Sequence, residues 1–229
     1  MALGPDIWAV VPVKETAFAK QRLAGLLSRS VRQRLALAMF EDVLQAIAAS
    51  SRLTGVIVVT VDQAASAIAS RRGACIWSEG AQDGHTGAVM AAADRLAGRG
   101  STMLTIPGDV PLVSPDDIGH LLDRHRGTPG FTIVPARDER GSNAIVCSPA
   151  NLVPLRFGAD SFLPHLAAAR ARGVEPTSVH LPRIALDIDN PDDVSEFMKV
   201  RSATRACDLL DRHNRGRAKV DFAHSGELQ

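Results

Sequence analysis

Three long apolar runs mark the first half of the chain. Residues 7–13, 56–61 and 102–106 are almost continuously apolar. Such runs are typical of parallel strands that are buried on both faces of a sheet. The stretches between them are long enough for crossover helices, so the pattern predicts an α/β fold with a mostly parallel central sheet.

A helical pattern follows the first apolar run. Apolar residues recur at every fourth position from Val31 to Ile47, which is the spacing of one helix face. Ser30 and Gln33 have the spacing of a capping box and predict that the helix begins there. Arg32 and Arg34 lie off the apolar face, and we expect both to be solvated.

The second half of the chain departs from simple alternation. Residues 131–136 and 143–147 both have strand character and are joined by a polar turn, which predicts a hairpin or a small antiparallel excursion. Residues 74–77 predict a short third strand, and residues 184–189 predict a last one. A helix is expected over residues 162–172, ending at a glycine.

Two helix starts carry acids that need no catalytic explanation. Residues 114–117 and 190–193 both read cap, proline, acid, acid, the order that satisfies free N–H groups at a helix N-terminus. Asp62 is a similar candidate cap for a helix over residues 64–72. From Arg212 the chain is polar and aperiodic, so we expect one domain over residues 1–211 and a disordered tail.

Composition narrows the class of protein. The chain has 229 residues and a formal net charge of +1, so neither a nucleic acid nor another polyanion is indicated as a partner. It has no apolar run long enough to cross a bilayer, and its first residues lack the basic region of a signal peptide. Cys75, Cys147 and Cys207 are expected to be buried thiols, which indicates a cytoplasmic protein.

Asp109 occupies a constrained turn directly after a strand. It follows the apolar run 102–106 and stands between Pro107 and Pro111, which preset φ and leave the turn few alternatives. Ligands of open α/β sheets bind at the carboxyl ends of strands. Asp109 is therefore a candidate metal ligand. The alternative is an acidic turn residue that caps its own backbone.

Two further acids lie within the strand expected over residues 184–189. Asp187 and Asp189 are two positions apart, so a strand would place both on one face. An acid inside an apolar strand is tolerated when it meets a cation or a metal. Together with Asp109 they form a candidate Mg²⁺ site, because clustered carboxylates repel one another unless a hard cation neutralises them.

Three segments are candidate anion-binding sites. Lys14, Lys20 and Arg22 follow the first strand, where a phosphate would lie in a doubly wound sheet, although a solvated basic loop is the alternative. A glycine-rich loop that contains Gly84 and Thr86 leads into a helix expected over residues 86–97, and is either a nucleotide loop or a flexible connector.

The third segment precedes the helix over residues 162–172. Gly158 and Ser161 stand at its N-terminus with Arg156 nearby, which combines free N–H groups, a hydroxyl and a guanidinium. An ordinary helix cap is the alternative.

Acids for a metal and cations for phosphates together indicate attack on a nucleotide phosphate. Neither a Ser-His-Asp nor a Cys-His pairing is evident, so no covalent route is expected.

Six motifs in order carry a specific resemblance: Val11–Lys14 with Ala19–Leu23, Leu35–Leu44, Ile106–Leu112, Gly141–Ala144, Arg156–Phe162 and Ala185–Asp193. The chain resembles the guanylyltransferases of coenzyme F-420 biosynthesis. This implies a Rossmann-like nucleotidyltransferase fold with helices on both faces of the sheet. It also implies transfer of GMP from GTP to the phosphate of phosphoenolpyruvate, 2-phospho-L-lactate or 3-phospho-D-glycerate, with release of pyrophosphate.

The resemblance also implies roles for individual residues. Asp109, Asp187 and Asp189 match the metal-binding aspartates. The matching positions for the phosphorylated acid are Asn143, Gly158 and Ser161. Lys14 and Lys20 match the basic loop that holds the GTP phosphates. An ionised acceptor phosphate needs no strong general base, because its second pKa is about 6.

One loop departs from the family pattern, since Asp83–Ala88 stands where family members often read Gly-Leu-Asn-Ala-Ala. The resemblance makes this loop a candidate for recognition of the base of GTP. Two other functions compete with guanylyl transfer. One is a nucleotidyltransferase acting on a sugar or alditol phosphate, and the other is a nucleotide-binding module without catalysis. The three acids and two lysines argue against the latter.

Overall fold

The computed structural model describes residues 6–225, with the side chains of residues 6–216. Within these residues, seven strands form one sheet in the order β3-β2-β1-β4-β6-β5-β7. The strands are β1 (Ile7–Pro12), β2 (Gly55–Val59), β3 (Cys75–Trp77), β4 (Thr102–Thr105), β5 (Gly130–Pro135), β6 (Ser142–Ser148) and β7 (Thr177–Ser178). The helices are α1 (Arg29–Ala48), α2 (Gln63–Arg71), α3 (Gly84–Ala97), α4 (Pro115–Arg124), α5 (Phe162–Ala171), α6 (Pro182–Ala185), α7 (Pro191–Lys199) and α8 (Arg205–Ser225), with short 3-10 turns η1 (Thr16–Phe18) and η2 (Gln21–Leu23).

The sheet is parallel on one side and mixed on the other. Strands β3, β2, β1 and β4 are parallel to one another, as the apolar runs predicted. β6 is antiparallel to both β4 and β5, which confirms the antiparallel excursion. The two-residue strand β7 was not predicted from sequence; it adds to β5 in parallel. Because β6 runs against β4, its first residues lie beside the last residues of β4.

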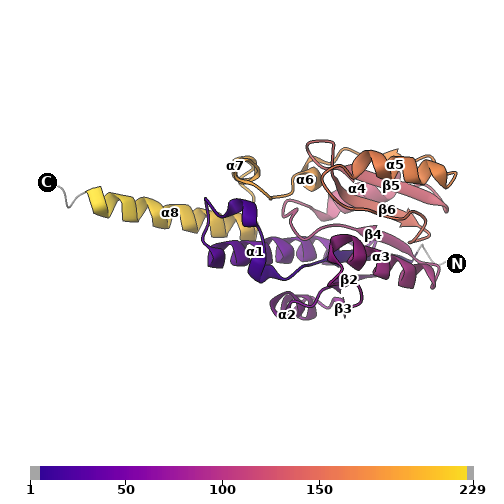
Figure 1. Cartoon of the computed structure of the whole chain (residues 1–229), viewed down its shortest axis with the longest axis horizontal. Helices are drawn as coiled ribbons and strands as arrows, with labels where there is room; N and C mark the ends of the chain where they lie inside the picture. The colour runs from indigo at the N-terminus through magenta and orange to yellow at the C-terminus, as the bar shows by residue number, and fades with distance from the viewer. Residues whose placement is uncertain (1–5, 226–229) are drawn as a thin grey trace.

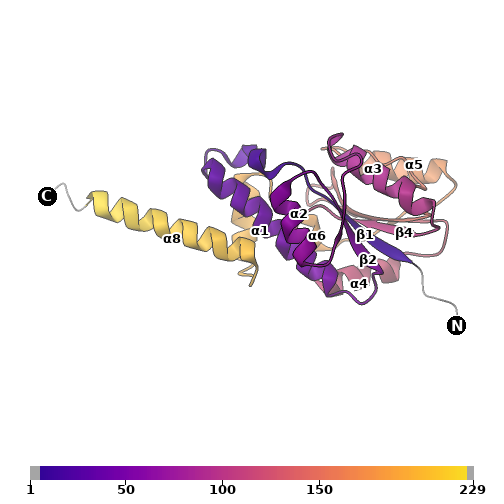
Figure 2. The same cartoon turned by 90° about the horizontal axis from the view of Figure 1, so that it is seen from below.

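Helices cover both faces of the sheet (Figure 2). On one face α1, α2, α4 and α6 pack on a cluster that includes Ala9 and Val11 of β1. On the other face α3 and α5 pack on a cluster that includes Val10 of the same strand. β1 is therefore buried on both faces, which explains its continuous apolar sequence. Burial of this apolar area on both sides is the main stabilising contribution to the sheet.

The start of α1 differs from its prediction. The helix begins at Arg29 with Ser28 as the N-cap residue, so the capping box expected at Ser30 is wrong. Arg32 is also not solvated: it is buried, and its guanidinium donates to the carbonyl of Leu27. The nearby chain turns back over η1 and η2 and covers this part of α1, a tertiary contact that the helical period does not show.

Two other helix starts agree with the sequence. Ser114 of α4 and Asn190 of α7 both form capping boxes, with Asp117 and Asp193 as the reciprocal partners. Asp62 accepts a hydrogen bond from Ala65 N, which confirms it as the cap of α2. The local pattern of cap, proline and acid therefore determined these starts without help from tertiary contacts.

The last helix extends into the region that was expected to be a disordered tail. α8 continues through Ser225, where disorder was expected from residue 212, and the remaining residues 226–229 lie outside the described part. Its first turns pack on α1, where Asp42 accepts hydrogen bonds from the backbone N–H groups of Arg205 and Ala206. The helix then extends away from the body (Figure 1).

Of the cysteines, Cys147 and Cys207 are buried, whereas Cys75 is exposed, contrary to expectation.

Candidate active site

The predicted functional residues gather at one edge of the sheet. This edge is formed by the carboxyl ends of β1 and β4 and by the amino end of β6, because β6 runs antiparallel to β4. Lys14 follows β1, Asp109 follows β4, and Ser142 begins β6. The topology therefore brings together residues that are far apart in the sequence, at the edge where open α/β sheets bind ligands.

Asp109 lies in a tightly packed turn. The neighbouring Val110 is completely buried, and an added Cβ on Gly108 would lie 3.4 Å from the ring of Phe40 in α1. The backbone of this turn is thus fixed against the core, while the Asp109 side chain keeps 27% of its surface exposed. A carboxylate held in this way can bind a ligand without a rearrangement of the strand.

Lys20 joins two of the predicted acids. Its Nζ lies 2.7 Å from Oδ2 of Asp109 and 2.6 Å from Oδ1 of Asp189. Burial opposes the charge of this ammonium, but the two carboxylates outweigh burial and raise the pKa of Lys20. The pKa of Asp109 is lowered, because the Lys20 charge outweighs the opposing effect of burial.

The backbone of Lys20 is unusual. Its φ of 54° and ψ of 46° lie in the left-handed region, which residues other than glycine seldom occupy. Such conformations persist where the surrounding structure determines them, and they cluster at functional sites. Here the conformation accompanies the double ion pair that directs the side chain inward.

Asp62 organises the loop that carries the basic residues. Besides capping α2, its Oδ2 accepts hydrogen bonds from the backbone N and the Oγ1 of Thr16, each at 2.7 Å. Lys14 and Arg22, in the same loop, are exposed and make no hydrogen bond or ion pair within the described residues. The side chains of Lys14 and Arg22 are therefore free to bind a ligand. The sequence predicted Asp62 only as a helix cap and did not show its contact with this loop.

Asp187 and Asp189 reach the site without the predicted strand. Residues 182–185 form helix α6, and the segment up to Asp189 has no regular structure, so the strand expected over residues 184–189 is wrong. Individual contacts, rather than a β ladder, position this segment. One of them is a backbone hydrogen bond of 3.1 Å from Ile188 N to the carbonyl of Asp109.

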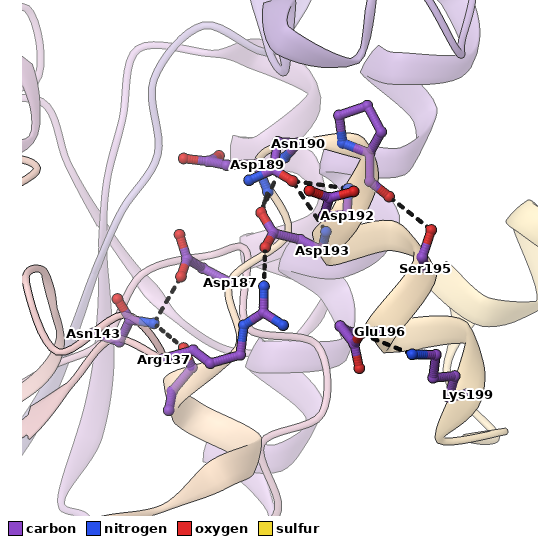
Figure 3. Close-up of polar contacts among 12 residues, drawn as sticks. Arg137, Asn143, Asp187, Asp189, Asn190, Asp192, Asp193, Ser195, Glu196 and Lys199 are labelled. Atoms are coloured by element: carbon purple, nitrogen blue, oxygen red, sulfur yellow. Dashed lines mark hydrogen bonds and ion pairs between the residues drawn. The ribbon is translucent and has the colours of Figure 1, made fainter.

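Side chains supply the other contacts (Figure 3). The amide nitrogen of Asn143 donates to the carbonyls of Ile184 and Ala185 and to Oδ1 of Asp187, each at 3.0 Å. Asp193 accepts from the backbone N–H of Asp189 at 3.0 Å through one oxygen. Its other oxygen pairs with Arg137 at 2.9 Å. The amide nitrogen of Asn143 fixes the acid segment, and its contact with the acceptor stays a prediction.

The three acids provide hard oxygen donors for a cation. Burial, and then the negative charge of Asp109, raise the pKa of Asp187 to about 6. This crowding of carboxylates suits Mg²⁺, which binds through one or two carboxylates and substrate phosphates. No group of three or more acid, histidine or cysteine side chains within the described residues has a metal-binding arrangement. The described acids are hard oxygen donors near one another, but they do not by themselves form a closed metal cage.

The loops before α3 and α5 are joined to each other. Gly84, with a φ of 76°, opens α3, and Thr86 Oγ1 accepts a hydrogen bond from Phe157 N at 3.0 Å. The ring of His85 lies 4.3 Å from the ring of Phe157 between centroids. The nucleotide loop and the anion pocket proposed from sequence are thus in direct contact.

The residues predicted for an anion pocket lie near one another before α5. Gly158 and the Arg156 side chain are exposed at its mouth, and within the described residues the Arg156 guanidinium has no hydrogen-bond partner. Ser161 is buried and precedes α5, but its side chain does not cap the helix; it donates to Ser142 Oγ at 3.1 Å. The ordinary-cap alternative for Ser161 is therefore wrong.

Sequence reasoning missed two histidines of this site. His85 was given no role, yet its Nε2 is buried and has no partner within the described residues. Burial lowers the pKa of His85 to about 4. His165 lies behind the predicted anion-binding residues. The sequence did not indicate a role for it, because a single histidine in an apolar helix matches no functional motif. Its contact with Ser142 becomes visible only when α5 is packed on the sheet.

An open groove of about 720 Å³ lies elsewhere, between the end of α1 and α4. Its lining includes Arg52 and Asp123 and none of the candidate residues. In the part of the chain described here, no helix is both long enough and apolar enough to cross a membrane.

Comparison with solved structures identifies the fold. The structure superposes with a TM-score of 0.73 on a solved structure named as a nucleotide-diphospho-sugar transferase from Desulfovibrio desulfuricans G20. The match covers 93% of this chain and 96% of that one, at 16% identity. The architecture is therefore the Rossmann-like nucleotidyltransferase fold that the sequence predicted.

Sequence comparison gives the family. The family described as "Guanylyl transferase CofC like" matches residues 7–229, and the chain belongs to it. A phosphoenolpyruvate guanylyltransferase of Roseiflexus castenholzii is 40% identical over 189 residues, covering 82% of this chain and 86% of the relative. A 3-phospho-D-glycerate guanylyltransferase of Colwellia psychrerythraea is 34% identical over 185 residues, covering 81% and 88%. The family and the reaction class predicted from sequence are confirmed.

Proposed function

We propose that the protein transfers GMP from GTP to the phosphate of a three-carbon phospho-acid, with phosphoenolpyruvate as the first candidate, in coenzyme F-420 biosynthesis. The observation that carries this proposal is the Lys20 bridge, which holds Asp109 and Asp189 at the carboxyl edge of the sheet beside the basic loop. Phosphoenolpyruvate is preferred over 3-phospho-D-glycerate because the relative named for it is the more similar of the two compared.

The chemistry requires positioning more than proton transfer. An oxygen of the acceptor phosphate attacks the α-phosphorus of GTP, the bond to the β-phosphate breaks, and pyrophosphate leaves. The acceptor oxygen is already ionised near neutral pH, because the second phosphate pKa is about 6. The enzyme must therefore bring two polyanions together and neutralise their charge. Lys14 and Arg22, exposed beside the site, are assigned to the GTP phosphates.

The proposal includes Mg²⁺. Asp109, Asp187 and Asp189 would hold the ion together with substrate phosphates, a donor set that suits a hard cation. When bound, Mg²⁺ neutralises charge that develops on the transferred phosphate and on pyrophosphate. Asn143 and Asp193 keep the backbone of the acid segment in place for this role.

The acceptor is assigned to the pocket before α5. Gly158 and the Arg156 guanidinium are exposed there for its phosphate and carboxylate, and Ser161 lies at its base. The nucleotide is assigned to the loop with Gly84 and Thr86, which contacts that pocket through Phe157. GTP and small phospho-acids are metabolites of the cell interior, so we assign the enzyme to the cytoplasm.

A substrate panel tests this function. The purified chain is incubated with GTP, Mg²⁺ and each of the three acids, and pyrophosphate is measured. Release is expected with one acid and is expected to stop when EDTA removes Mg²⁺. Release only with a sugar or alditol phosphate would favour the rival nucleotidyltransferase. Binding of GTP without release under any condition would favour a module that has lost catalysis.

A further inference from the structure

His165 lies at the base of the proposed acceptor pocket and contacts two of its parts. Its side chain is 1% exposed and extends from α5 toward the loop that precedes that helix. Nε2 accepts a hydrogen bond of 2.9 Å from Arg156 N, and Nδ1 lies 3.0 Å from Ser142 Oγ. A single imidazole therefore connects the pocket loop with the first residue of β6.

These contacts determine where the imidazole carries its proton. A backbone N–H can only donate, so Nε2 of His165 must be unprotonated. The neutral ring then carries its proton on Nδ1, which donates to Ser142 Oγ. Burial lowers the pKa of His165 to about 4, so the ring is neutral near pH 7.

The same reasoning determines the direction of the Ser142 hydroxyl. Ser142 Oγ accepts from Nδ1 of His165 and also from Ser161 Oγ, at 3.0 and 3.1 Å. A hydroxyl oxygen has two lone pairs, and both are now used. The Ser142 proton must therefore point to a third group, and no third partner for this half-buried side chain lies within the described residues. A hydroxyl constrained to donate suits an anion.

Tilted and edge-on contacts between aromatic rings hold the pocket loop from its other side. Phe157 follows Arg156, and its ring lies between His85 and His165, with centroid distances of 4.3 and 5.4 Å. The Phe157 N–H is bound by Thr86 of α3. The loop is thus fixed by two successive backbone N–H groups, of which His165 holds one.

From this geometry we propose that His165 is a positioning residue of the acceptor pocket. It fixes the Arg156 backbone and orders the hydroxyl protons, so that Ser142 donates its proton to the anionic acceptor. The proposal rests on the proposed function for the identity of that acceptor. Ser142 thereby becomes an acceptor contact, the role that the resemblance assigned to its neighbour Asn143.

Steady-state kinetics with GTP, Mg²⁺ and phosphoenolpyruvate test this role in His165→Phe, which keeps a ring against Phe157 and removes both hydrogen bonds. The KM for phosphoenolpyruvate should rise about tenfold, the loss expected for a hydrogen bond to a charged group. The KM for GTP should stay within about twofold of wild type. An equal rise in both KM values, or no rise in either, would overturn the proposal.

A matched control is His125→Phe. His125 is only partly buried; it is hydrogen-bonded to Ser148 at the opposite end of β6 and to Thr132 of β5. This variant should lower the melting temperature and leave both KM values unchanged. A selective rise in the phosphoenolpyruvate KM here too would show that loss of a buried histidine, rather than its position, causes the effect, and would count against the proposal.

Two further variants separate positioning from structure. His165→Gln retains a hydrogen-bond acceptor and a donor, so its KM for phosphoenolpyruvate should return close to the wild-type value. Ser142→Ala should raise that KM as His165→Phe does. The double variant should be no worse than the worse single one, because both changes remove the same hydroxyl contact. Additive effects would mean that the two residues act independently.

One measurement does not depend on the substrate. The ¹⁵N chemical shifts of the His165 ring in the wild-type chain report which nitrogen carries the proton. A ring protonated at Nδ1 is expected, and a ring protonated at Nε2 would overturn the inferred order of protons. If the wild-type chain transfers GMP to none of the three acids, the proposed function fails, while this measurement still decides the role of His165.

Discussion

Strand β6 has a serine–histidine pair at each end. At its first residue, Ser142 lies 3.0 Å from His165; at its last residue, Ser148 lies 2.8 Å from His125. Both imidazoles carry pKa values that burial lowers. The two environments nevertheless differ. Ser148 also bonds Thr102 at 2.6 Å, so its hydroxyl is enclosed by protein groups, whereas Ser142 retains a proton for a ligand.

The direction of the strands accounts for this difference. The first end of β6 lies at the carboxyl edge of β4, beside the turn of Asp109, whereas the other end lies beside the start of β4. Ligands of such sheets bind at the carboxyl edge. The same pair of side chains is therefore part of a site at one end and part of the framework at the other. Side-chain type alone does not reveal a function; position in the topology does.

The largest expected effect comes from Asp109→Ala at the site end. Loss of this carboxylate should lower kcat by about a thousandfold or more, since it removes a group assigned to charge neutralisation. Pyrophosphate release measures the rate, and thermal melting checks the fold. The matched control is Asp123→Ala. The Asp123 side chain is 65% exposed and pairs with Arg52 on the surface. Turnover of Asp109→Ala close to wild type would refute the assignment of the site.

The next effect concerns the acid segment. Asn143→Ala removes the hydrogen bonds to Ile184, Ala185 and Asp187, so kcat should fall by about a hundredfold, near the upper range for loss of a group that orients metal ligands. The control is Asn151→Ala, whose amide bonds an exposed Asp94. If both asparagine variants keep wild-type kcat, Asp187 does not depend on this support.

A pH titration of stability compares the two histidines directly. The folded-state pKa of His165 is about 4, against an ordinary value of 6.5. Its contribution is therefore complete above pH 6.5 and is lost as pH falls toward 4, because the unfolded chain binds the proton more readily. Between pH 7 and 4.5 this loss is about 2 kcal/mol for the wild type.

Urea unfolding at both pH values measures that difference. His165→Phe should remove about 2 kcal/mol of the acid-induced loss of stability, because it deletes the titrating group. His125→Phe should remove less, since His125 is less buried than His165. An equal acid-induced loss in wild type and His165→Phe would mean that His165 titrates normally in the folded chain.

The smallest effect is expected from Ser148→Ala at the far end of β6. It leaves Thr102 and His125 without one hydrogen-bond partner, which should reduce the free energy of unfolding by about 1 kcal/mol. Neither KM should change. If the KM for phosphoenolpyruvate rises as in Ser142→Ala, the distinction between the two ends of β6 does not hold.

The sequence was sufficient for most of the framework. Continuous apolar runs predicted β1, β2 and β4, and the strand pair β5 and β6 was recognised by its polar turn. These features depend on local pattern, which is visible without tertiary structure. The acids at helix starts were also interpreted correctly, because capping chemistry is local.

The errors arose where tertiary contacts replaced local rules. The acid segment resembled a strand because apolar and acidic residues alternate from Leu186 to Asp189. Its observed position depends on Asn143, more than forty residues earlier in the chain. Likewise, Arg32 is buried because η1 and η2 fold back over α1. The residue pattern could not show either contact, since both depend on how separate segments of the chain pack together.

The Lys20 bridge has a consequence for the way the protein would respond to its ionic surroundings. Two carboxylates of the site already have a counter-charge that is covalently part of the chain. Their repulsion is therefore relieved during folding itself, unlike proteins in which the metal must bind before the chain can fold. With Mg²⁺ in the role proposed above, a fall in available divalent ions should slow turnover while the amount of folded protein stays constant. Ion supply would then act as a reversible control of rate, independent of protein turnover in the cell.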